Sequence, residues 1–191
     1  MPKDSQAILE RHDRIELEGN EYRINNSHKV YIRAVKIMRS RDIFDDDKIE
    51  VLIPLLFADP IPEGLEQSAI NAFFDLFTED KKKSSEKATF DMIEDSQYVF
   101  AGFMQTYHID LDEAEMSIEK FVALLRGLPS DTKLADIIKI RSMDIPKATK
   151  YNAEQINAIM RAKAKFALKS ESDSPWKGFA KVIKEWAEHG R

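Results

Sequence analysis

The stretch "RIELEGNEYRINNSHKVYIRAVKIMRS", residues 14–40, decides the fold class because its apolar period changes within it. On both sides of Gly19-Asn20, apolar and polar residues alternate, as is typical of a tight β-hairpin. From Asn26 onward the apolar residues recur with the period of an α-helix. We therefore predict a hairpin over 14–24, with Gly19-Asn20 as its turn, followed by helices. The apolar residues of the alternation are Ile15, Leu17, Tyr22 and Ile24.

Helical spacing continues through the rest of the chain, so we predict a mainly α protein of about seven or eight helices. Each helix presents one apolar face, which we expect to pack in the core. In chain order, the core-facing residues that we predict are Tyr31, Ala34, Val35 and Met38; Ile49, Leu52, Ile53 and Leu56; Leu65, Ala69, Ala72, Phe73 and Leu76; Ile93, Phe100, Phe103, Met104 and Tyr107; Ile118, Phe121, Val122 and Leu125; Leu134, Ile137 and Ile138; and Ile156, Ile159, Met160 and Phe166.

Several residues mark where these helices begin, bend and end. Ser27 is a typical N-cap, and Asn152 with Gln155 has the spacing of a reciprocal capping pair. Pro54 lies within an apolar helical run, where we expect it to kink or split the helix. Gly127 and Pro129 should stop the helix that precedes them.

The chain is organised as one helical domain over residues 1–168, with the hairpin at 14–24. Residues 79–87, "EDKKKSSEK", are its most linker-like stretch. Residues 169–191 form a polar break and a last amphipathic helix. There is no cysteine, no signal-like N-terminus and no run of ~18 apolar residues. We therefore expect a protein in the cytoplasm of its cell, without disulfides and away from the membrane.

The last predicted helix, residues 174–190, is a candidate site of protein interaction. It holds both tryptophans of the chain and follows the polar stretch "KSESDS". Large aromatic rings of this kind are common anchors of interfaces, so we expect this helix to mediate self-association or capture of a partner. The alternative is that it folds back on its own domain. The stripe that we assign to this site consists of Trp176, Phe179, Ile183 and Trp186.

Charge is unevenly distributed along the chain. Residues 147–191 carry ten Lys or Arg against five Asp or Glu, although the whole chain has a formal charge of −5. An acidic body with a basic tail favours partner contacts, or head-to-tail self-association into an open oligomer, over nucleic-acid binding. The alternative is two solvated helix faces of opposite sign.

The acidic run "YHIDLDEAEMSIEKF", residues 107–121, is the stretch most suggestive of a metal or acid–base site. Counted from Asp110 or from Asp45, the first and third ligand positions of a calcium loop carry Asp, but the later positions do not fit. We interpret the run as a connection between two helices. Tyr107 ends the first, Ile109 and Leu111 insert as apolar residues, and the acidic residues meet the positive end of the next helix dipole. Those acidic residues are Asp112, Glu113 and Glu115.

Motifs for other chemistry are also missing from the sequence. The four histidines are scattered without an HExxH-like pair, and neither a G-x-S-x-G elbow nor a phosphate-binding glycine loop occurs. The sequence does not exclude a pair of carboxylates that acts in acid–base catalysis, because acidic residues are abundant. We expect no catalytic, cofactor-binding or metal site, and hence a protein that is not an enzyme.

The segment from Phe90 to Ile156 resembles a family of tail-module proteins from long-tailed phages and prophages of Gram-positive bacteria. The similarity extends over residues 15–168, including the hairpin and the helix that follows it. In place of the family's His-Trp-Trp cluster, this chain has "MSIEK", residues 116–120, so the surface made by those rings is changed. The residues that carry the resemblance are Phe90, Asp91 and Asp95; Tyr107, Ile109, Asp110 and Leu111; Lys120, Phe121, Ala123, Leu124, Gly127, Leu128 and Pro129; Ile137, Ile140 and Arg141; and Pro146, Thr149, Lys150 and Tyr151.

This resemblance implies a role in tail morphogenesis. Genes of the family typically lie beside that of the tape measure protein, which is the position of tail assembly chaperones. The resemblance therefore implies a non-enzymatic chaperone that binds the tape measure protein in the cytoplasm of the bacterial host, with the major tail tube protein as a second partner. The alternative is a structural tail or tail-completion protein retained in the virion.

Overall fold

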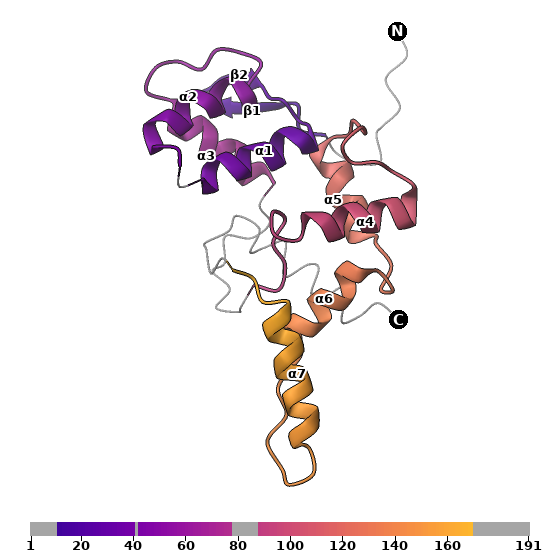
Figure 1. The fold of residues 1–191 in the computed structure, drawn as a ribbon. Coiled ribbons are helices and arrows are strands. Elements are labelled where there is room, and N and C mark those ends of the chain that lie inside the picture. Colours follow the sequence, from indigo (N-terminus) through magenta and orange to yellow (C-terminus); the bar gives the residue numbers. More distant parts are fainter. Residues whose placement is uncertain (1–10, 41, 78–87, 170–191) are drawn as a thin grey trace. The chain divides into compact units, whose positions relative to one another are not determined.

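The computed structural model describes residues 11–40, 42–77 and 88–169 of the chain. These residues form seven helices and one two-stranded antiparallel sheet (Figure 1), which confirms the predicted mainly α class with a short N-terminal hairpin. Contacts group them into two compact units. Unit 1 comprises 11–77 and 112–124, and unit 2 comprises 88–111 and 125–169.

The hairpin of unit 1 pairs β1 (Arg14–Leu17) with β2 (Asn20–Arg23). Leu17 lies opposite Asn20, so the turn is Glu18-Gly19 and the predicted Gly19-Asn20 turn is wrong by one residue. Both turn residues have positive φ, 49° and 79°, as a type I′ turn requires. The second position has the larger φ, which suits glycine, whereas a non-glycine residue tolerates the left-handed helical value of the first. This preference places Gly19 second.

Three helices of unit 1 follow the hairpin: α1 (His28–Arg39), α2 (Asp45–Leu56) and α3 (Glu66–Leu76). α1 packs on α2, α2 on α3, and α3 on β1. The prediction that Met38 faces the core is wrong, because this residue is exposed. It lies in the last turn of α1, beyond the buried residues of that helix. The buried apolar residues shared by these elements are Ile15, Leu17, Tyr31, Ala34, Val35, Leu52, Leu56, Ala69, Ile70 and Phe73.

Pro54 does not split its helix, contrary to one of the two effects predicted for it. α2 continues to Leu56, and the backbone N–H of Phe57 still bonds the carbonyl of Ile53. Proline removes the hydrogen bond to the carbonyl four residues earlier, that of Glu50. Both Pro54 and Glu50 are exposed, so water can hydrate that carbonyl and the helix persists.

Unit 2 contains α4 (Ser96–Tyr107), α6 (Lys133–Ser142) and α7 (Ala153–Lys165), and α5 (Ile118–Arg126) begins in unit 1 and ends in unit 2. Within unit 2, α4 packs on α6 and α6 on α7. α5 stops at Arg126, just before Gly127 as predicted, and α6 ends at Ser142. The buried apolar residues of unit 2 are Phe90, Met92, Val99, Phe103, Leu125, Leu128, Leu134, Ala135, Ile137 and Ile138.

The buried face of α4 is rotated from the predicted one. Met104 is 39% exposed instead of core-facing, whereas Val99 and Gly102 are buried. A Cβ placed on Gly102 would lie 3.1 Å from Cδ1 of Leu128. The glycine thus permits a close approach that turns its own side of the helix inward.

The acidic run is a connection between helices, which confirms that interpretation. α4 ends at Tyr107, His108 follows with a left-handed φ of 55°, and α5 begins at Ile118. Ile109 and Leu111 are only half-buried, and Met116 is the buried apolar residue of the connection. Glu115 pairs with Lys29 at 2.7 Å within unit 1. Among the residues that the structure describes, no group of three or more metal-ligating side chains occurs.

Candidate protein-interaction surface

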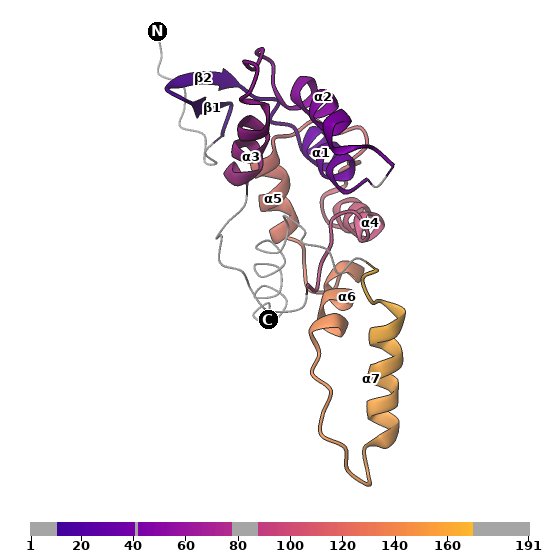
Figure 2. The same cartoon turned by 90° about the vertical axis from the view of Figure 1, so that its left-hand side faces the viewer.

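A helical arm is the most exposed apolar feature of unit 2. We define the arm as residues 143–165, which comprise the extended segment 143–152 and α7. Both views show α7 running back alongside that extended segment (Figures 1 and 2). No residue of α7 is buried, so this helix lies at the edge of the unit with little to cover it.

Four large apolar side chains of the arm are exposed to solvent. Tyr151 is 85% exposed and Met160 is 52% exposed, and Ile156 and Ile159 are only half-buried. The predicted inward packing of this helix is therefore wrong for Met160 and incomplete for the rest of the stripe. The other two exposed residues are Met143 and Ile145.

α7 forms a helix without a buried face because its residues have high helix propensity. The sequence "AEQINAIMRAKAK" is rich in alanine and long straight side chains, which have the highest helix propensity. Asn152 is the N-cap residue, as predicted, but the reciprocal bonds with Gln155 are absent because Asn152 has other partners. Its side chain accepts from the N–H of Thr149 (2.7 Å) and donates to the carbonyl of Lys147 (2.9 Å), which closes the turn before the helix.

The base of the arm is held by Lys163. Its Nζ donates to the backbone carbonyls of Arg141 and Met143, each at 2.6 Å. These two carbonyls lie at the end of α6 and at the start of the extended segment. One cation therefore binds α7 to the segment that it runs beside.

Arg141 holds the chain just past α7. Its Nε donates to the carbonyl of Phe166 (2.6 Å), and its Nη1 donates to the carbonyl of Thr89 (3.0 Å). The same guanidinium bonds both carboxylate oxygens of Asp95, at 2.6 and 2.8 Å. The backbone N–H of Lys169 adds a bond to Glu94 at 2.8 Å. The arm is therefore anchored at the C-terminal end of its helix.

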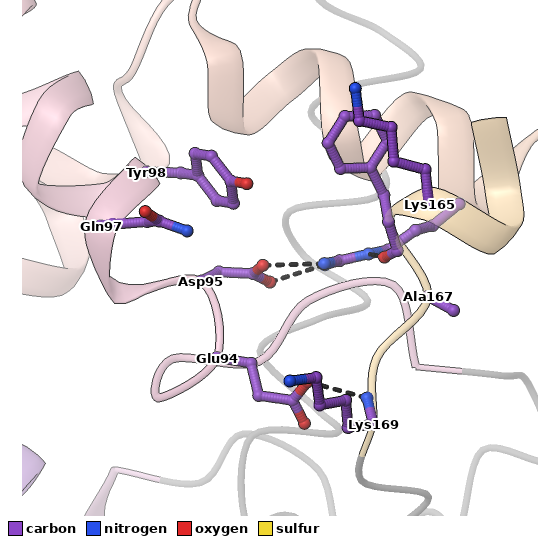
Figure 3. Close-up of a pocket in the computed structure, with 9 residues that line it drawn as sticks. Glu94, Asp95, Gln97, Tyr98, Lys165, Ala167 and Lys169 are labelled. Atoms are coloured by element: carbon purple, nitrogen blue, oxygen red, sulfur yellow. Dashed lines mark hydrogen bonds and ion pairs between the residues drawn. The ribbon is translucent and has the colours of Figure 1, made fainter.

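A shallow pocket of about 260 Å³ opens beside this anchor. Figure 3 shows Gln97 and Tyr98 on one side of it and Lys165, Ala167 and Lys169 on the other. The carboxylate of Asp95 points into the dashed ion pair, not into open space. Both carboxylates of the pocket have partners, because Asp95 pairs with Arg141 and Glu94 accepts from the backbone N–H of Lys169.

The second exposed apolar surface lies in unit 1. We define the α2 face as Phe44, Asp47, Glu50, Val51 and Pro54. Their spacing puts them on one side of α2, and all five are exposed, Phe44 to 82%. Of the eight large apolar residues that are exposed in the described chain, only Met104 lies outside the arm and the α1–α2 pair.

The interaction residues predicted from the sequence, Trp176, Phe179, Ile183 and Trp186, lie outside the described residues, as do the linker-like stretch 79–87 and the helix 174–190. Sequence reasoning missed the arm because its stripe has ordinary helical spacing. The available signal was that alanine and lysine fill most of the other positions of the helix.

The described residues thus form a mainly helical protein. Most of their exposed large apolar side chains lie on the arm and on the α1–α2 pair. Residues 10–168 match the family described as Bacteriophage Gp15 protein. The match spans most of the chain, so the protein belongs to that family, and this supports a phage structural or assembly protein. No curated protein and no solved structure matches the chain. Within the described residues, no helix is both long and apolar enough to cross a bilayer.

Proposed function

We propose that this protein is a non-enzymatic tail assembly chaperone of a long-tailed phage or prophage of Gram-positive bacteria. In this proposal it binds the tape measure protein in the host cytoplasm while the tail is built. The observation that carries the proposal is the gathering of exposed apolar side chains on the arm and on the α1–α2 pair. Membership of a phage protein family and the resemblance of the sequence support it.

A chaperone of this kind needs apolar surface that stays exposed without aggregating. The arm combines the two requirements, because its apolar side chains alternate with Lys147, Lys150 and Arg161. A helix edge of this composition suits the binding of another amphipathic helix, and a tape measure protein is long and helical. In the pocket, the carboxylate of Asp95 is already paired with Arg141, which supports a binding role over catalysis.

Co-expression tests the proposal directly. The full chain carrying an affinity tag is produced together with the tape measure protein of the same phage or prophage. We expect the tape measure protein to become soluble and to copurify with the tagged chain. A tape measure protein that stays insoluble in the presence of this chain, as it does alone, contradicts the proposal.

The alternative is a structural tail or tail-completion protein. Mass spectrometry of purified virions separates the two roles, because a chaperone leaves before the tail is complete. We expect the chain in lysates and tail intermediates but not in mature particles. A stoichiometric amount in mature particles would favour the structural role.

A further inference from the structure

The two exposed apolar surfaces have opposite charge. Residues 143–165, the arm, contain five Lys or Arg and two Asp or Glu, whereas residues 42–54, which include the α2 face, contain five Asp or Glu and one Lys. On the arm, Lys150 and Arg161 are exposed near Tyr151 and Met160; on the α2 face, Asp47 and Glu50 are exposed near Val51. Each surface therefore has the composition that the other would bind.

We propose that the arm of one copy of this chain docks on the α2 face of a second copy. Apolar contact is made by Met160 and Tyr151 against Phe44 and Val51. Lysine and arginine of the arm lie against the carboxylates of the α2 face. The contact is between copies and goes beyond the proposed function. It uses the same arm, which therefore binds a second copy when no tape measure protein is present.

The dimensions of the two helices suit this contact. α7 has 13 residues and α2 has 12, so each is roughly 20 Å long at 1.5 Å per residue. Two such helices can pack along their whole length. Exposed Ala153 and Ala164 flank Met160 on α7 at helical spacing, and small residues there let the second helix approach closely.

A second copy fits the observations better than other occupants. A nucleic acid would meet the basic arm but would be repelled by the acidic body of the same chain, because the whole molecule is negative. An unrelated acidic protein would leave the exposed Phe44 and Val51 of the α2 face unexplained. A second copy accounts for both surfaces, in a head-to-tail contact of the heterologous kind.

The test uses full-length chains that each lack one surface. The arm variant is Lys150→Glu/Arg161→Glu, and the α2 variant is Asp47→Lys/Glu50→Lys. Light scattering and sedimentation are measured up to about 100 µM, well above the Kd of a weak micromolar interface. We expect the unaltered chain to exceed its monomer mass of 22.0 kDa with rising concentration, and each variant alone to associate at least about tenfold more weakly.

Mixing the variants identifies the pairing of surfaces. The arm variant keeps an unaltered α2 face and the α2 variant keeps an unaltered arm, so an equimolar mixture should associate although neither variant associates alone. A chain that carries all four reversals should associate again, because the two charges have been exchanged. Strong association of the unaltered chain should also weaken with added salt.

Matched controls are Lys139→Glu on α6 and Glu113→Lys in the connection before α5, both exposed and outside the two surfaces. They should associate like the unaltered chain, and circular dichroism should show all variants folded. A monomeric unaltered chain, a mixture that stays monomeric, or an equal loss in the controls would each overturn the proposal. Tape measure co-expression with the same variants is scored separately. A failure of self-association therefore cannot be confused with a failure of the proposed function.

Discussion

The guanidinium of Arg141 forms a bidentate ion pair with the carboxylate of Asp95, 46 residues earlier in the chain, with N···O distances of 2.6 and 2.8 Å. The side chains are 9% and 1% exposed, so the pair is shielded from water. Because Arg141 also bonds the carbonyls of Thr89 and Phe166, this pair connects the start of α4, the end of α6 and the chain after α7. Both residues belong to the motifs that carry the phage-family resemblance.

Removing one partner of this pair should destabilise unit 2. Arg141→Met leaves the carboxylate of Asp95 buried without its cation, so we expect a loss of about 3–5 kcal/mol in the free energy of unfolding. Urea denaturation followed by circular dichroism measures it. The exposed pair of Arg14 and Glu21 is the control, where Arg14→Met should cost under about 1 kcal/mol. If both substitutions lowered the free energy of unfolding equally, the burial of the Arg141–Asp95 pair would not be the source of its stabilising effect.

Glu119 should make unit 1 sensitive to acid. Burial raises its pKa, but hydrogen bonds from the N–H of His12 and from the side-chain amide of Asn26 outweigh burial and lower the pKa below its ordinary 4.5. A lowered pKa means that the stabilisation is complete above 4.5 and is lost as pH falls through the folded-state value.

We therefore expect Glu119→Gln to lose less stability than the unaltered chain between neutral pH and about pH 3. Urea midpoints at a series of pH values measure this difference. Glu63→Gln, in an exposed loop, is the matched control. An unchanged acid dependence in Glu119→Gln would contradict the role given to these hydrogen bonds.

Gly102→Ala should destabilise the protein even though alanine is the better helix former. The gain in helix propensity is about 1 kcal/mol, but the new Cβ would meet Cδ1 of buried Leu128 at 3.1 Å. Overpacking of this kind costs about 1–3 kcal/mol, so we expect a net loss near 1 kcal/mol. In a Leu128→Ala background the same change should become neutral or stabilising. A double-mutant cycle measures this coupling, and additive effects would refute it.

Met160→Ser should cost little, because no residue of α7 is buried. We expect a loss below about 1 kcal/mol, as is usual for surface positions. Phe103→Ala, in the buried face of α4, should cost about 3–5 kcal/mol. Thermal and urea unfolding compare the two. A loss at Met160 as large as that at Phe103 would mean that the arm is packed in a core.

The elements of the fold could be predicted from the sequence because their signals are local. The change of period near Asn26 separated the hairpin from the helices. Gly127 and Pro129 marked the end of α5, since the backbone preferences of these two residues act wherever they occur. Leu52, Phe73, Ile137 and most of the other fully buried positions followed from apolar spacing alone.

What depended on tertiary structure was which apolar faces are covered. Spacing shows that α7 has an apolar stripe, but only the packing of unit 2 shows that Met160 stays exposed. Likewise, α4 is apolar on several sides, and the side that is buried is the one on which Gly102 packs closely against Leu128. Asp95 and Arg141 are 46 residues apart in the sequence, and only the fold brings their side chains within 2.6 Å. Burial and ion pairing depend on neighbours distant in the chain, and a periodic pattern along one helix carries no information about those neighbours.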